Sequence, residues 1–143
     1  ADVPPEVGER VVAVDLLATA AVVRAALPEL ERSHGRVVTI ASTLGRKAVS
    51  DATAYCAAKF GVVGFTRALA AELAGSVGVT LLLPGGMRTG FFDEREERYR
   101  PGADAVLNDP AHVAAAVMFA LSQPPGCEVR ELLICPDRES SYP

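Results

Sequence analysis

A tyrosine and a lysine lie four residues apart in the stretch AYCAAKF, as Tyr55 and Lys59, with only small side chains between them. In a helix this spacing places both side chains on one face, about one turn apart. An ammonium group beside a phenol favours the ionised phenolate, and a phenol in that setting can exchange a proton near neutral pH. The same spacing is also common on ordinary helix surfaces. Taken alone, the pair is compatible with both interpretations.

The pattern of apolar residues predicts helices and strands in alternation. A helical stripe covers residues from about 6 to 27 and is expected to end near Pro28, because proline lacks a backbone donor. Helical spacing returns from about 51 to 74, and a third helix is expected to begin at Asp109, a good cap residue before Pro110. Short apolar runs predict three strands, GRVVTIAS, GVTLLLP and EVRELLICP, the last of them at an exposed edge of the sheet.

This order of elements predicts an α/β domain with a parallel sheet and helices on its faces. In such folds, ligands bind at the carboxyl ends of the strands. Ser42 lies just past the first predicted strand, and Pro84, Gly85 and Gly86 lie just past the second. The tyrosine and lysine pair falls early in the helix between those strands. Three separate features of the sequence are therefore expected to meet at one rim of the sheet.

The stretches GRVVTIASTLG, YCAAK and LLLPGGMRTGFF together resemble the short-chain dehydrogenase/reductase family. Ser42 precedes Tyr55 by thirteen residues, as the serine precedes the tyrosine in that family. Tyr55 and Lys59 match its YxxxK pattern, and Pro84 to Thr89 matches its PGxxxT segment. The resemblance covers nearly the whole chain. It implies a Rossmann-like three-layer α/β/α fold, of which residues 1–143 would form the C-terminal, catalytic half with about three strands.

The resemblance also implies an oxidoreductase that transfers a hydride between NAD(P)(H) and a carbonyl or secondary alcohol. Tyr55 would exchange a proton with the substrate oxygen, which Ser42 would hold, and Lys59 would support the phenolate and bind the nicotinamide ribose. A positioned general acid typically contributes about 10²- to 10⁴-fold. The cofactor contacts implied by the resemblance come from Tyr55, Lys59, Pro84, Gly85, Met87 and Thr89. The C-terminal stretch resembles a subgroup that often uses NADP, but the residues that distinguish NADP from NAD belong to the other half of the fold.

Two features depart from the family pattern. The family has an asparagine in the helix before the serine strand, within a stretch similar to VNL, whereas this chain has VDL with Asp15 at that position. The Asp15 carboxylate, a further candidate catalytic group, would either pair with Lys59 and weaken its help to Tyr55 or point to water. The chain also contains no G-x-G-x-x-G turn and begins without a methionine, which suggests that sequence is missing. A non-catalytic remnant that serves as an assembly or interaction module is the alternative function.

Composition narrows the expected partners. The net charge is -4 and no basic run with interleaved aromatics occurs, which argues against nucleic acid. The longest apolar run is interrupted by Asp15 and Arg24, which argues against a membrane span. Three cysteines without the spacing of a zinc site indicate reduced thiols, a cytoplasmic protein and no metal.

The expected partners are a small-molecule carbonyl or alcohol substrate and further copies of the chain. The resemblance implies a homodimer or homotetramer formed through the helices around 6–27 and 51–74, whose small residues would let helices approach closely. The long segment from about Thr89 to Leu107 is expected to form a lid over the substrate. Its mixture of aromatic and charged residues indicates neither a purely apolar nor a simple anionic substrate.

Overall fold

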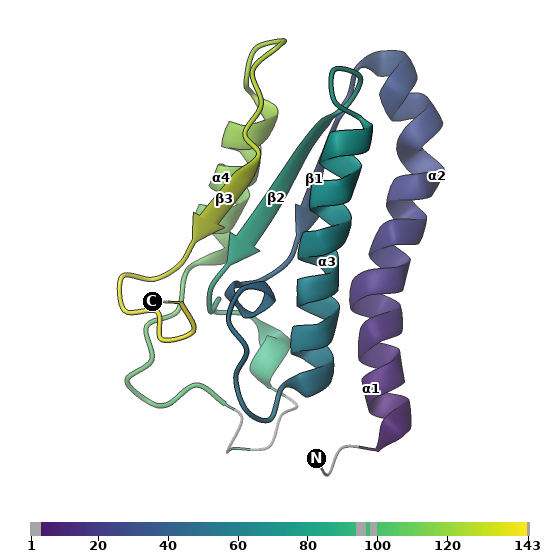
Figure 1. Cartoon of the computed structure of the whole chain (residues 1–143). Helices are drawn as coiled ribbons and strands as arrows, with labels where there is room; N and C mark the ends of the chain where they lie inside the picture. The colour runs from purple at the N-terminus through teal and green to yellow at the C-terminus, as the bar shows by residue number, and fades with distance from the viewer. Residues whose placement is uncertain (1–3, 94–96, 98–99, 143) are drawn as a thin grey trace.

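The chain folds around a parallel three-stranded sheet in the computed structural model, which describes residues 4–93, 97 and 100–142 (Figure 1). The strands β1, β2 and β3 lie in that order, so β2 pairs with a neighbour on each side. The strands are β1 (Arg36–Ile40), β2 (Gly78–Pro84) and β3 (Glu131–Ile134). The helical segments are α1 (Pro5–Val12), a π-helical segment (Ala13–Leu17), α2 (Ala18–Ser33), a 3-10 turn (Thr43–Gly45), α3 (Thr53–Glu72), a second 3-10 turn (Gly90–Phe92) and α4 (Pro110–Leu121). The predicted alternation of helices with parallel strands is confirmed.

The pairing of the strands aligns their carboxyl ends. Pro84, the last residue of β2, lies opposite Ile134, the last residue of β3. The hydrogen-bonded ladder continues one residue beyond β1, where the Ala41 N–H donates to the Leu82 carbonyl at 2.8 Å. It also continues beyond β2, where the Gly85 N–H donates to the Ile134 carbonyl at 2.9 Å. The turns that leave β1 and β2 therefore start at the same rim, as the sequence predicts.

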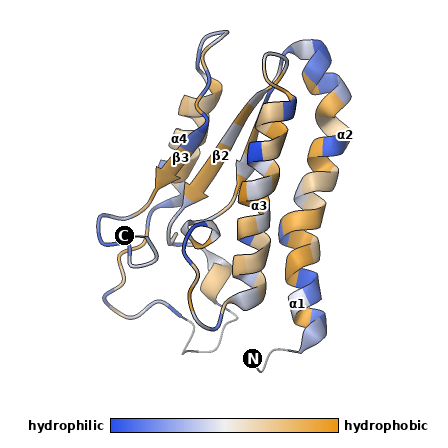
Figure 2. Cartoon of the chain, in the orientation of Figure 1, coloured by the Kyte–Doolittle hydropathy of each residue, from blue (hydrophilic) through white to orange (hydrophobic). Residues whose placement is uncertain are grey.

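The central strand β2 is buried along almost its whole length, because it has a strand on each side and helices on both faces. Its continuous apolar sequence is typical of such a strand and appears as an orange arrow in Figure 2. Two clusters of buried side chains join this strand to the helices. They comprise Val23, Leu69, Leu73, Val77 and Val79 in the first and Ala41, Val62, Val63, Leu81 and Leu83 in the second.

The helices cover both faces of the sheet. α3 lies over one face and contacts β1 and β2, while α1 and the π-helical segment pack against α3 and α2 reaches β1 (Figure 1). α4 contacts all three strands from the opposite face (Figure 1). The Asp109 carboxylate accepts a hydrogen bond from the Ala111 N–H at 2.8 Å, and Pro110 is the first residue of α4. The predicted start of this helix is confirmed.

The N-terminal helical run extends further than the sequence predicts. α1, the π-helical segment and α2 follow one another without a break from Pro5 to Ser33, so the predicted end near Pro28 is wrong. Pro28 removes one backbone donor from α2 and leaves the Arg24 carbonyl without its helical partner. Arg24 is exposed, so water can bond to this carbonyl. Leu27 and Leu30 pack against the cluster that contains Val23, and their burial offsets the cost of the proline.

This run, Pro5–Ser33, is long and apolar enough to cross a membrane when judged by length and composition alone. Its most apolar window has a mean hydropathy of 1.8, although Asp15 and Arg24 interrupt it. Asp15 and Arg24 do not prevent this result, contrary to the prediction from the sequence. One such helix is weak evidence of a membrane span, because buried core helices of soluble proteins pass the same test, although only 6% of this window is buried.

The segment between β2 and α4 is irregular where the structure describes it. Its two ends are tied together beside the rim: Met87 forms an isolated parallel bridge with Asn108, and the Arg88 N–H donates to the Asn108 carbonyl at 2.9 Å. A 3-10 turn, Gly90–Phe92, follows. Part of the predicted lid, Thr89–Leu107, lies outside the described residues.

Candidate functional site

Lys59 lies at the centre of the candidate site. α3 begins at Thr53, so Tyr55 and Lys59 occupy its first two turns, close to the rim. The Lys59 side chain is only 11% exposed, and its ammonium lies 3.8 Å from the Asp15 carboxylate. The ammonium also lies 5.5 Å from the centroid of the Tyr55 ring and donates to the Ile40 carbonyl, at the end of β1, at 3.4 Å. The ammonium is therefore held between three elements, next to the phenol.

Burial lowers the pKa of Lys59 below its ordinary value, because desolvation disfavours the charged ammonium. The charge of Asp15 and its hydrogen bond act in the opposite direction and raise this pKa, without cancelling the effect of burial. Of the two orientations that the sequence leaves open for Asp15, the structure has the one that faces Lys59. The ammonium lies near the Tyr55 ring, and the Asp15 carboxylate partly offsets its positive charge.

The π-helical segment directs Asp15 toward α3. It spans Ala13–Leu17 and inserts one wider turn into the helical run, a feature that frequently occurs at functional sites. The neighbouring residue, Leu16, packs directly on Gly61 of α3, where an added Cβ would lie 2.6 Å from Leu16 Cδ2. Glycine at position 61 thus permits the close approach that brings Asp15 near Lys59.

Ser42 begins the turn that leaves β1. Its Oγ accepts a hydrogen bond from the Leu44 N–H at 3.1 Å and so caps the 3-10 turn. The hydroxyl hydrogen of Ser42 can then be donated to a substrate oxygen. Gly45 closes the turn against α3, and a Cβ at this position would lie 2.8 Å from the Lys59 carbonyl oxygen. The serine turn therefore packs on the backbone of the helix that carries the lysine.

Of the predicted cofactor contacts, Pro84 ends β2, and Gly85, Met87 and Thr89 follow it in the turn at the same rim. Thr89 Oγ1 accepts from the Phe91 N–H at 3.3 Å, which leaves the threonine hydrogen for donation. Together with the Lys59 ammonium, this turn supplies hydroxyl, ammonium and backbone groups. Such groups match the hydroxyls of a ribose and the amide of a nicotinamide, so the residues present fit that end of the cofactor.

The first part of the predicted lid lies against the tyrosine. The Phe91 ring is centred 5.8 Å from the Tyr55 ring and tilted by 55° to it. The Phe92 ring packs edge to face on Phe91 at 5.0 Å. These two rings give the neighbourhood of the phenol an apolar surface, and Phe91 itself is exposed.

Analysis of the sequence missed the segment that follows β3. The Gly86 N–H donates to the Glu139 carboxylate at 2.7 Å, and the hydroxyls of Ser141 and Thr43 lie 2.6 Å apart. The position of this segment in the sequence could have predicted its place. It follows a strand that is parallel to the others, and the carboxyl end of such a strand must reach the same rim. Among the residues that the structure describes, no group of three or more His, Cys, Asp or Glu side chains could hold a metal ion.

Comparison with known proteins decides the family. A family model described as short chain dehydrogenase matches residues 1–100, which is more than half of the chain. The chain belongs to the short-chain dehydrogenase family. The family resemblance of the sequence is thereby confirmed.

Relatives of this short-chain dehydrogenase are about twice as long. L-fucose dehydrogenase of Mus musculus is 32% identical over 141 residues, which cover 90% of this chain and 52% of the relative. The structure of an actinorhodin polyketide ketoreductase with NADPH is 29% identical, with a TM-score of 0.79 over 94% of this chain and 59% of that chain. An alcohol dehydrogenase from Thermococcus sibiricus, complexed with 5-hydroxy-NADP, is 22% identical and similar in fold, with a TM-score of 0.82 over 93% of this chain and 55% of that chain.

The predicted Rossmann-like architecture is confirmed by these similarities of fold. The chain spans about half the length of the curated relatives that it matches. The matched half contains Ser42, Tyr55 and Lys59, which the resemblance assigns to catalysis.

Proposed function

We propose that this short-chain dehydrogenase chain carries the catalytic residues of an NAD(P)-dependent oxidoreductase acting on a small carbonyl or secondary alcohol. The observation that carries the proposal is the position of the Lys59 ammonium, which lies beside the Tyr55 ring at the carboxyl end of the sheet. NADP or NAD, when bound, would supply or accept the hydride. The dehydrogenase relatives support this function over a non-catalytic assembly module.

In the proposed reduction, Tyr55 gives the proton of its Oη to the substrate oxygen as negative charge develops there. An ordinary phenol has a pKa near ~10, so the phenolate needs stabilisation to act near neutral pH. The Lys59 ammonium supplies it. Ser42 donates its hydroxyl hydrogen to the same substrate oxygen and fixes its position. Phe91 and Phe92 give this region an apolar surface.

Lys59, Thr89 and the backbone at Met87 would hold the nicotinamide, its ribose and its carboxamide. These residues would serve the nicotinamide end of the dinucleotide. Both NADP and NAD share this end. The proposal therefore covers either cofactor.

The test is kinetic and uses the full natural polypeptide that contains this sequence. Tyr55→Phe should abolish turnover and leave the cofactor dissociation constant nearly unchanged, because the phenol moves a proton while the cofactor is held by other groups. Lys59→Ala should impair both turnover and cofactor binding. Tyr142→Phe, which removes the same atom near the C-terminus, serves as the control. Full activity in Tyr55→Phe would contradict the proposal.

We also propose a homodimer or homotetramer formed through α1, α2 and α3. The N-terminal helical run exposes large apolar side chains. They are Val7, Val14, Leu17 and Val22. Much of the ribbon of this run has the orange of hydrophobic residues in Figure 2. An open groove of about 600 Å³ lies between α1 and the start of α3, lined by Pro5, Gly8, Glu9, Val12, Ala13, Leu17 and Ala54. Exposed apolar surface of this kind is typical of interaction sites. Light scattering should show that Val22→Glu lowers the molar mass.

We propose the cytoplasm as the location of the protein. All three cysteines, Cys56, Cys127 and Cys135, are free thiols, and thiols are kept reduced in that compartment. Because the run Pro5–Ser33 has the length of a membrane span, cell fractionation is the appropriate test. Recovery in the membrane fraction after a salt wash would contradict the proposal.

A further inference from the structure

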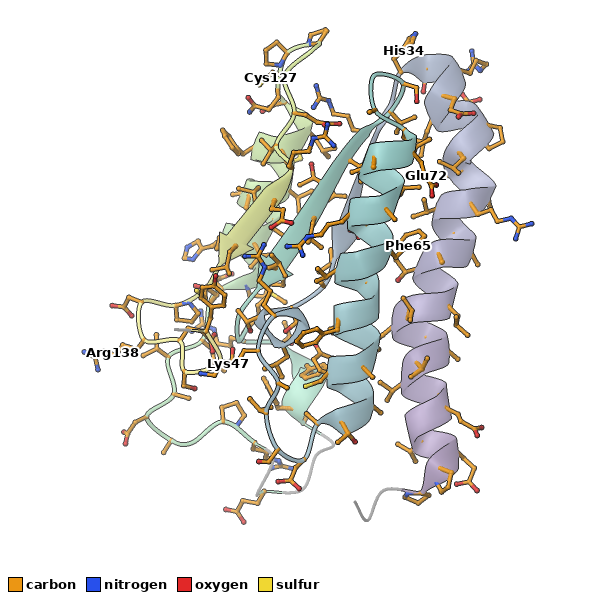
Figure 3. All side chains as sticks on the ribbon, in the orientation of Figure 1. His34, Lys47, Phe65, Glu72, Cys127 and Arg138 are labelled. Carbon is orange, nitrogen blue, oxygen red and sulfur yellow. The ribbon has the colours of Figure 1, made fainter. Side chains whose placement is uncertain are left out.

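The segment that follows β3 connects the two turns of the proposed active site. The segment Glu139–Ser141 returns to the carboxyl end of the sheet, where the Lys47 ammonium donates to the Ser140 carbonyl at 3.2 Å. Figure 3 shows Lys47 among the loops at this end of the molecule, whereas Arg138 points outward into solvent. The segment thus packs against the turn after β1.

Glu139 contacts the turn after β2. Its Oε2 accepts a hydrogen bond from the Gly86 N–H at 2.7 Å. The carboxylate lies directly against Gly85, where an added Cβ would overlap it and would also lie 2.6 Å from Cys135 Cβ. The absence of a side chain at position 85 is therefore what gives the carboxylate its place. This explains the first glycine of the PGG stretch without reference to the cofactor.

The same carboxylate reaches the turn after β1 through two hydroxyls. Glu139 Oε1 accepts from the Ser141 N–H at 2.9 Å and from the Ser141 hydroxyl at 2.7 Å. Since that hydroxyl gives its only hydrogen to Glu139, it accepts from the Thr43 hydroxyl, 2.6 Å away. Thr43 is 1% exposed and directly follows Ser42. A continuous series of hydrogen bonds thus runs from Gly86 to the residue beside the catalytic serine.

Glu139 is charged at neutral pH. Burial raises its pKa, but hydrogen bonds from Ser141, Gly86 and Ser140 outweigh burial and hold the pKa below its ordinary value. Charged acceptors form stronger hydrogen bonds than neutral ones. Burial raises the pKa of the neighbouring Cys135 thiol, and the negative charge of Glu139 raises it as well. The thiol therefore stays protonated beside the carboxylate.

We propose that Glu139 is a positioning residue that fixes the cofactor turn after β2 relative to the serine turn after β1. The inference rests on the proposed function, in which Ser42 holds the substrate oxygen and the backbone at Met87 holds the nicotinamide carboxamide. Hydride transfer requires the two reacting carbons at a fixed separation, and small misplacements of reacting groups cost much of the rate. Glu139 bonds directly to the turn after β2 and, through the Ser141 hydroxyl, to the turn after β1, and thereby sets this separation without touching the substrate.

Hydrogen–deuterium exchange measured by mass spectrometry tests the link without any need for activity. Glu139→Gln keeps the size of the side chain but replaces one acceptor oxygen by an NH2 group. This group would face either the Gly86 N–H or the N–H and hydroxyl of Ser141. Amide exchange across residues 85–88 or across 43–46 should rise roughly tenfold or more, since hydrogen bonds to charged groups are among the stronger ones. Ser141→Ala should raise exchange across 43–46 and leave 85–88 protected. Asp137→Asn, an exposed carboxylate nearby, should change neither.

Kinetics of the full natural polypeptide give the second readout. Glu139→Gln should lower kcat about tenfold and raise KM for the cofactor, while Ser141→Ala should lower kcat with the cofactor KM unchanged. Unaltered exchange in Glu139→Gln, or a uniform rise over the whole chain that reports general destabilisation, would overturn the inference. A complete absence of dehydrogenase activity in the natural protein would instead overturn the proposed function, and the exchange data would still decide whether the link exists.

Discussion

The pairing of Asp15 with Lys59 predicts that removing the carboxylate charge lowers the pKa of Lys59. Burial already holds this pKa below its ordinary value, and Asp15 is the group that raises it. Asp15→Asn keeps the size of the side chain, so burial of the lysine remains while the compensating attraction is lost. The pKa of Lys59 should therefore move further from its ordinary value.

The magnitude follows from the 3.8 Å separation of the two charges. Unit charges about 4 Å apart attract by about 4 kcal/mol at an effective dielectric constant of ~20. The Asp15 side chain is 30% exposed, so solvent screens the pair, and exposed pairs contribute at most about 1 kcal/mol. Because Lys59 is much less exposed than Asp15, the attraction between the two charges lies between these limits. We expect Asp15→Asn to remove about 1 to 2 kcal/mol of attraction.

The carbon-13 shift of Lys59 Cε, followed by NMR against pH, measures this change directly. Asp51→Asn is the matched control, because Asp51 is exposed and lies in the loop before α3. A Lys59 pKa that stays constant or rises in Asp15→Asn would refute the reasoning, as would an equal shift in the control. In the active enzyme, the pH profile of turnover should move to lower pH, because the ammonium then acts more fully on the Tyr55 phenolate.

Three further predictions concern stability and assembly. Gly45→Ala should destabilise the fold by about 1 to 3 kcal/mol, because its Cβ meets the Lys59 backbone, whereas Gly64→Ala, with open space around it, should be neutral or stabilising in thermal unfolding. The stability that Glu139 confers should be complete above its ordinary pKa of 4.5 and lost as pH falls below that value, so the difference in melting temperature between wild type and Glu139→Gln should narrow in acid. Among the described residues β1 pairs only with β2, so one edge of this strand has unpaired backbone groups. Residues 1–143 expressed alone should therefore self-associate in sedimentation velocity and show no saturable NAD(P)H binding. A monomer that binds NAD(P)H with micromolar affinity would contradict this prediction.

Much of the fold could be predicted because the apolar runs are short, continuous and well separated. GVTLLLP is typical of a strand buried on both faces, and the structure has it as the central strand. The positions of Ser42 and the Tyr55–Lys59 pair followed from the same order of elements, since parallel strands bring their carboxyl ends together. Local pattern and overall topology agree in this part of the chain.

The remaining features depend on tertiary contacts that a local pattern does not contain. Pro28 normally ends a helix, but Leu27 and Leu30 keep α2 continuous by packing on the core. In the π-helical segment, Leu16 packs on Gly61, and these two residues are far apart in the sequence. Glu139 was missed because its partner, the Gly86 N–H, lies 53 residues away and belongs to the backbone.

The π-helical segment changes what the loss of one residue from the N-terminal helical run would do. A regular α-helix turns by about 100° with each residue, since it has 3.6 residues per turn. The wide turn at Ala13–Leu17 takes up one extra residue, so loss of one residue from this segment would restore a regular helix with α1 and α2 facing nearly as they do now. Loss of one residue from α1 itself, with the wide turn kept, would instead rotate the part of α1 before the deletion by roughly 100° and turn its apolar side chains away from their present direction. The place of a single-residue deletion within this helical run thus decides whether one surface of the protein is redirected.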